Sequence, residues 1–236
     1  MKGGLVVMLA ALCMLGRGSE ALAAARKIVQ ADSYELALQV PPVESFTTKP
    51  LYTLARFSHW DEILQEPAPP AELRYLTGVW YYARGLAHSA RGRYDSATVA
   101  LDSVATIGPS LPLDLPASLN PARSVLANAE KHLRADIAAR QGRRDEAMAE
   151  LRKGIALEDE LTYDEPAGWY LPLRQPLGAL LLAAGRPKNA EREYRDDLVR
   201  FPHNGWSLHG LEQSRRAQKR TREADAVAKE RKQVGA

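Results

Sequence analysis

The sequence predicts an all-α protein built of about six helix pairs, and three observations lead to this prediction. A short junction of the form Gly-Arg-x-x-x-Ala recurs along the 236 residues. Between the junctions, apolar residues recur at the spacing of amphipathic helices. Two junction intervals are equal, because 92 − 58 = 34 and 219 − 185 = 34. Equal units that each bury one face against the next indicate a repeat architecture, in which the whole chain is one continuous object.

The junctions share a residue that ends one helix and a small or apolar residue, five positions later, that packs at the start of the next. They begin at Gly16, Ser58, Gly92, Gly142, Gly185 and Lys219, of which the second and the last are degenerate. One such match is weak in an alanine-rich chain, whereas six in register are a strong signal. The other intervals are longer than 34, so those units carry insertions.

We expect a single domain over residues 1–236. Its helix pairs are expected at approximately 4–30, 47–66, 71–107, 120–157, 169–201 and 205–233. Proline marks the boundaries, because it cannot continue a helix. Pro41-Pro42 breaks the chain after the first pair, and a proline-containing loop is expected at 108–119. Asn120 is predicted as a helix N-cap, followed by Pro121 at the first helical position.

One stretch, residues 169–206, carries the clearest unit: WYLPLRQPLGALLLAAGRPKNAEREYRDDLVRFPHNGW. Leu177-Gly178 lies in its first helix, Ala190 and Tyr194 lie in its second, and Pro202 closes it. This stretch resembles the tetratricopeptide pattern W-x2-L-G-x2-Y…A-x3-F…P. The small residues Gly178 and Ala190 predict a close helix crossing, with the ring of Tyr194 beside it.

The resemblance has departures: Arg174 stands where the tetratricopeptide pattern has Trp, and Leu181 stands where it has Tyr. The family resemblance implies a right-handed superhelix, which helical periodicity alone does not. The turn at Tyr163–Pro166, the pair Trp169-Tyr170 and the later Asn204–Trp206 are similar to the last repeats of larger bacterial tetratricopeptide proteins. The chain is therefore similar to the C-terminal half of such proteins.

Composition excludes several function classes. A net charge of +3 is too small to indicate nucleic-acid binding, which needs a dense basic patch. The single cysteine, Cys13, leaves no internal disulfide. The five histidines are not paired at metal-ligand spacing, so no metal or other cofactor is expected. No apolar run reaches the length of a membrane span.

Residues 1–23 allow two interpretations. Lys2, the apolar run 5–15 and Ala21-Leu22-Ala23 have the layout of a secretory signal peptide. The alternative is the first helix pair of the stack, turning at Gly16. The junction pattern favours the helix pair and therefore a cytoplasmic location. Cleavage after residue 23 would instead indicate a periplasmic or secreted protein.

The sequence shows few of the residue patterns that catalytic sites require. Cys13 has no neighbouring histidine, and neither a Gly-x-Ser-x-Gly motif nor a phosphate loop is present. Asp164 and Glu165 would do acid–base chemistry only if they were buried near each other. Adjacent residues point apart on a helix, so a helix-capping turn is the favoured interpretation, and an enzyme is the least favoured hypothesis.

A binding surface remains, so the predicted function is a non-catalytic scaffold that holds a protein or peptide in an inner groove. Offsets from Gly178 and its counterparts give the groove positions: Tyr82, Leu86, Ser89, His132, Asp136, Ala139, Gln175, Ala179, Leu182, Trp206, His209, Gln213 and Arg216. The equally open alternative is that Tyr82 and Trp206 only pack between units. A second hypothesis is a sensor or accessory domain that binds a small ligand at an acidic-aromatic turn: Tyr163, Asp164, Glu165, Trp169, Tyr170 and Arg174.

Overall fold

The computed structural model describes residues 2–31, 33–164 and 167–234. The protein is all-α, and its consecutive helices pack as pairs, which confirms the predicted class and pairing. The pairs are α1 (Lys2–Met14) with α2 (Gly18–Ala31), α5 (Lys49–Arg56) with α6 (Trp60–Gln65), α7 (Arg74–Ala90) with α8 (Tyr94–Ser110), α9 (Ala122–Arg140) with α10 (Arg144–Asp159), α11 (Arg174–Ala183) with α12 (Pro187–Arg200), and α13 (Gly205–Ala217) with α14 (Thr221–Gln233). No helix of the described residues has the length and apolar character that a membrane crossing requires.

The helix junctions are equivalent in backbone geometry. Each begins with a residue at positive φ, between 60° and 81°: Gly16, Ser58, Gly92, Gly142, Gly185 and Lys219. At each, the next N–H donates across the turn to the helix that is ending, as Arg186 N does to Leu181 O at 2.9 Å. This left-handed turn is a common helix C-cap, and glycine adopts it without steric cost. Five positions on, Ala190 and its counterparts are all fully buried.

The close helix crossing expected at Gly178 is present and involves a second glycine. A Cβ on Gly178 of α11 would lie 2.6 Å from Cζ of Tyr194, and one on Gly210 of α13 would lie 2.1 Å from the same atom. The ring of α12 therefore fits between two neighbouring helices only because both residues lack a side chain. Tyr194 is 4% exposed, so it is part of the core.

A short irregular connector replaces the simple break expected at Pro41-Pro42. It consists of α3 (Tyr34–Gln39), the 3-10 turn η1 (Pro41–Val43) and α4 (Glu44–Thr47). Glu44 anchors the connector, because its Oε1 accepts the N–H of Leu76 at 2.9 Å. Burial raises the pKa of this carboxyl group.

The predicted N-cap at Asn120 is wrong. β1 (Pro116–Ala117) pairs antiparallel with β2 (Asn120–Pro121) inside the expected loop, and α9 begins only at Ala122. The Asn120 side chain instead accepts from Thr162 N at 2.8 Å and donates to Thr162 O at 3.1 Å. A contact 42 residues away in sequence thus outcompeted the local cap. α11 likewise begins at Arg174 rather than at 169, and the residues from 167 to 173 form an irregular segment of bends.

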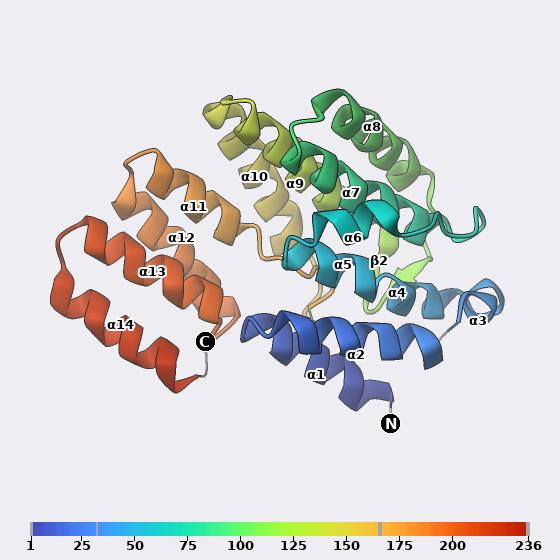
Figure 1. Ribbon diagram of the computed structural model, residues 1–236, viewed down its shortest axis with the longest axis horizontal. Helices are drawn as coiled ribbons and strands as arrows, with labels where there is room; N and C mark the ends of the chain where they lie inside the picture. Colours follow the sequence, from blue (N-terminus) through green and yellow to red (C-terminus); the bar gives the residue numbers. More distant parts are fainter. Residues whose placement is uncertain (1, 32, 165–166, 235–236) are drawn as a thin grey trace.

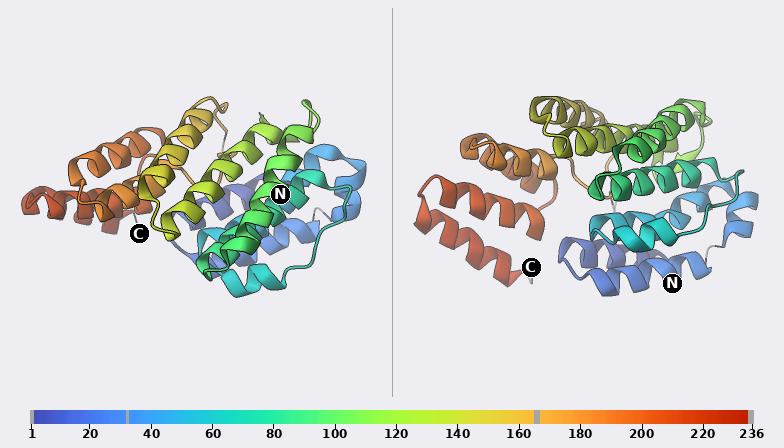
Figure 2. Two further views of the ribbon diagram at one scale, coloured as in Figure 1. Left: turned by 90° about the horizontal axis from the view of Figure 1, so that it is seen from above. Right: turned by 45° about the horizontal axis from the view of Figure 1, so that its top comes forward.

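The pairs follow one another in chain order around a curved path (Figure 1). Figure 2 shows the same succession from two further directions. The first helices of successive pairs pack together, as α5 does on α7 and α7 on α9. The curvature brings the first and last pairs together: Trp206 of α13 donates its indole N–H to the Cys13 carbonyl of α1 at 3.0 Å. α1 and α2 form a small apolar core separate from the main one.

Candidate functional site

An aromatic cluster lies where the first helices of the early pairs face the irregular segment that precedes α11. The inner cluster comprises Tyr52 of α5, Tyr82 of α7, His132 of α9, and Trp169 and Tyr170 from the segment 167–173. The Tyr82 hydroxyl lies 2.6 Å from His132 Nδ1 and 2.8 Å from the Tyr170 hydroxyl. Two predicted groove positions, Tyr82 and His132, therefore do meet. Both are buried.

The segment 167–173 occupies the space in which we expected a partner. Its Tyr170 ring stacks on Tyr52, with centroids 4.6 Å apart and 19° between the ring planes. Its end is held by Glu158 of α10, whose Oε2 accepts from Leu173 N at 2.8 Å. Burial raises the pKa of Glu158 to about 7. The chain thus covers its own inner positions. The sequence did not predict this coverage, because a helix beginning at 169 would have pointed the rings of Trp169 and Tyr170 elsewhere.

The inner cluster is uncharged at neutral pH. Burial lowers the pKa of His132 to about 4, so its imidazole is neutral. Burial raises the pKa values of Tyr52, Tyr82 and Tyr170, so their hydroxyls stay protonated. A neutral network of stacked rings and hydroxyl hydrogen bonds stabilises the packing of the segment 167–173 against the helices.

A second polar chain joins α5 to the last two pairs. Arg56 Nη1 donates to Gln175 Oε1 at 3.0 Å, and Gln175 Nε2 donates to Asp197 Oδ2 at 3.3 Å. Ser207 also donates to this carboxylate. Arg56 lies over the Trp206 ring, with Cζ 4.7 Å from its centroid, a cation–π arrangement. Gln175, a predicted groove residue, is therefore engaged within the protein.

Most of the exposed groove positions gather on one face of α13. Trp206 is 40% exposed, and His209, Gln213 and Arg216 are also exposed. Trp206 reaches α1 and contacts Phe57 and Arg56, so this face of α13 points toward α1 and α5. Arg216 pairs with Glu212 and Asp225.

The other groove positions are divided between surface and interior. Asp136 pairs with Arg140 on the same helix. Ser89 is buried, and its hydroxyl has no hydrogen-bond partner among the described residues. Leu86 is part of the core. Ala139 and Leu182 are half-buried, and Ala179 is exposed.

The residues of the acidic-aromatic turn do not form one pocket. Trp169 and Tyr170 belong to the inner cluster. Arg174 pairs instead with Asp159, with Nη2 to Oδ2 at 2.7 Å. Tyr163 is 65% exposed, and Asp164 accepts the N–H of Leu119 at 3.3 Å. Glu165 lies outside the described residues, so the pairing of Asp164 with Glu165 for acid–base chemistry is left as a hypothesis.

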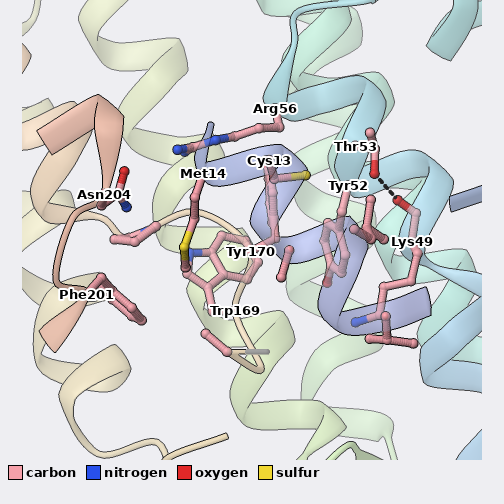
Figure 3. Close-up of a pocket in the computed structure, with 15 residues that line it drawn as sticks. Cys13, Met14, Lys49, Tyr52, Thr53, Arg56, Trp169, Tyr170, Phe201 and Asn204 are labelled. Carbon is pink, nitrogen blue, oxygen red and sulfur yellow. Dashed lines mark hydrogen bonds between the residues drawn. The ribbon is translucent and has the colours of Figure 1, made fainter. Parts of the chain in front are cut away.

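A cavity that no sequence motif indicated lies beside the inner cluster. It has a volume of about 80 Å³ and is walled by α1, α5, the segment 167–173 and the start of α13. Figure 3 shows Lys49 and Arg56 on opposite sides of the rings of Tyr52, Trp169 and Tyr170. The available signal was the spacing of Lys49, Thr53 and Arg56, which places all three on one face of α5. Within the described residues, no group of three or more His, Cys, Asp and Glu side chains is placed to hold a metal ion.

Comparison of the chain with models of known protein families and with curated proteins found no match.

Proposed function

We propose that the protein is a non-catalytic scaffold of the tetratricopeptide type, a right-handed superhelix that holds a protein or peptide partner. The observation that supports this most is the equivalence of the junctions. A positive-φ residue, a hydrogen bond across the turn and a fully buried residue recur at each one. Stacked helix pairs of this kind create long concave surfaces that recognise partners.

The proposed contact surface is the exposed face of α13, which we call the α13 face: Trp206, His209, Gln213 and Arg216. These residues recur at three- and four-residue spacing, so they share one side of the helix. An aromatic ring beside polar side chains suits a partner helix or peptide. Of the inner positions, Gln175 is linked to α13 through Asp197, to which both Gln175 and Ser207 donate. Tyr82 and His132 are buried in the inner cluster instead.

The test places a photo-reactive amino acid at His209 and, as a control, at Val199, an exposed residue of α12 that is 83% exposed. The proposal expects a partner to crosslink at position 209 and not at 199. For the partner so identified, Gln213→Ala combined with Arg216→Ala should weaken binding about tenfold, a change of about 1.4 kcal/mol. Equal crosslinking at both positions, or unchanged affinity in the double variant, would refute the assignment of the α13 face.

A further inference from the structure

Two cations line the same cavity without a carboxylate partner. Lys49 and Arg56 both project from α5 into its wall. Neither forms an ion pair with any described residue. Among the described residues, Arg56 donates to the neutral Gln175 amide and lies over the Trp206 ring, and the Lys49 ammonium has no partner at hydrogen-bond distance. The charges of Asp164 and Asp197 act on Lys49 and Arg56 only from farther away. A half-buried cation without an anion in contact is stabilised when it pairs with one.

The rest of the cavity wall is mostly apolar. Val6, Leu9 and Met14 of α1 form one side, and Trp169 and Phe201 form another. Among the described residues that line it, none is Asp or Glu. The indole N–H of Trp169 is also buried without a hydrogen-bond partner. The cavity is therefore an apolar space bordered by two cations, which complements an apolar molecule with an anionic head.

The size of the space restricts the class of ligand. A cavity of about 80 Å³ is several times the roughly 10–15 Å³ that one water molecule requires. It accommodates a short aliphatic chain or a single ring, and it is too small for several residues of a peptide.

We propose that this cavity binds a small amphiphilic carboxylate, whose apolar body lies against α1 and Trp169 and whose head group pairs with Lys49. Recognition then combines burial of apolar surface with charge-assisted hydrogen bonds, as in most small-molecule sites. The site is independent of the proposed scaffold function. It differs from the acidic-aromatic turn predicted from sequence, because its charge is positive and Arg174 takes no part in it.

The only cysteine of the chain provides a reporter at the site. Cys13 lines the cavity and is half-buried, and burial raises the pKa of its thiol. A ligand in the cavity should slow its alkylation. The full-length protein is treated with N-ethylmaleimide at pH 8, and the modified fraction is followed by intact mass. The probes are hexanoate, hexanamide and hexylammonium, which have six carbons each and differ in the charge of the head group.

The proposal expects hexanoate to protect Cys13 saturably, hexanamide to bind about tenfold more weakly, and hexylammonium not to protect. Equal protection by the acid and the amide would overturn it, as would no protection by hexanoate at millimolar concentration. A peptide with a free carboxyl terminus that protects when hexanoate does not would also overturn it, in favour of a peptide site. This comparison needs no variant, so it does not depend on a mutant that folds.

Lys49→Met should raise the Kd for hexanoate about tenfold, because it removes one cation from the wall. The matched control is Lys27→Met, which makes the same change of charge at an exposed residue of α2. It should leave the Kd within about twofold. If the two variants bind hexanoate equally well, Lys49 is not a ligand-pairing residue and the proposal is wrong.

Discussion

The first and last helix pairs turn in the same way but present opposite surfaces. α1 turns into α2 at Gly16 with φ 75°, and α13 turns into α14 at Lys219 with φ 61°. α1 has no charged side chain after Lys2, and its Val7 is 56% exposed. The exposed residues of α14 are mostly charged, among them Arg222, Asp225, Lys229 and Glu230.

Turn geometry and surface polarity are independent of each other in these two helix pairs. Backbone geometry and one buried residue make the turn, because Ala21 and Ala224 are both fully buried despite their different surroundings. The polarity of the outer helix is a separate property of each pair. α14 has a polar outer side, whereas α1 leaves apolar side chains exposed.

The largest expected effect is at the C-terminal end, where Gly210 contacts the Tyr194 ring. Gly210→Ala should lower the free energy of unfolding by about 2–3 kcal/mol, since the new methyl group would overlap the ring. Gly4→Ala in α1 is the control. No atom lies within 4 Å of its added Cβ, so this variant should be neutral or up to about 1 kcal/mol more stable. Urea unfolding measures both, and equal effects would contradict the packing of Tyr194.

The next effect concerns pH. Burial raises the pKa of Glu191, but hydrogen bonds from Gln218 and Arg215 and the charge of Arg220 lower it below its usual value. A lowered folded-state pKa stabilises the protein above the unfolded value and loses that effect as pH falls through the folded one. Glu191→Gln should therefore cost about 1–2 kcal/mol at pH 7 and progressively less as the pH falls through the folded-state pKa.

The control for this pH effect is Glu20→Gln at the N-terminal end. Glu20 forms an exposed pair with Arg17 at 2.5 Å, and such pairs contribute less than about 1 kcal/mol. Thermal unfolding of both variants across pH 3–8 makes the comparison. If Glu191→Gln lowered stability equally at pH 3 and pH 7, the ion pairs would not be responsible for its effect.

The two turns themselves should respond in opposite directions. Gly16→Ala places a side chain at positive φ and should destabilise by about 1 kcal/mol. Lys219→Gly relieves the same conformation and should stabilise by roughly 0.5 kcal/mol, because glycine also loses more entropy on folding. Chemical denaturation resolves both signs. Destabilisation by Lys219→Gly would mean that its side chain contributes more than its backbone strain costs.

The smallest effect on stability is expected from Val7→Lys, which gives α1 a polar outer side like that of α14. The free energy of unfolding should change by no more than about 0.5 kcal/mol, because the side chain is exposed. Binding of an apolar dye should fall, since the exposed apolar area decreases. An unchanged dye signal would show that the dye binds elsewhere than on α1.

Local signals predicted the helices, their pairing and the positions of the turns, because these depend on contacts between residues close in sequence. Gly185 and Ala190 are examples: the turn needs positive φ at one and burial at the other. Where a distant partner competed, prediction failed. Asn120 forms a hydrogen bond with Thr162 instead of capping a helix, and Trp169 and Tyr170 lie in an irregular segment held by Glu158.

The candidate site was predictable only in part for the same reason. Tyr82 and His132 were identified by their offsets, and they do meet. The coverage of these residues by Tyr170 was not predicted, since the contact between Tyr82 and Tyr170 joins residues 88 positions apart. In the sequence, Lys49 and Arg56 show only a helical spacing. The cavity that they line forms only when α1, α5, the segment 167–173 and the start of α13 come together.

An all-α chain of paired helices with repeated left-handed turns can be predicted from the sequence, because helical periodicity and turn residues act locally. Three features are visible only in the folded protein. The chain fills its own inner positions, α13 reaches α1 through Trp206 and Cys13, and Lys49 and Arg56 face one apolar cavity. The physical reason is that curvature accumulates over successive packed pairs. It therefore brings together residues nearly two hundred positions apart that no local pattern connects.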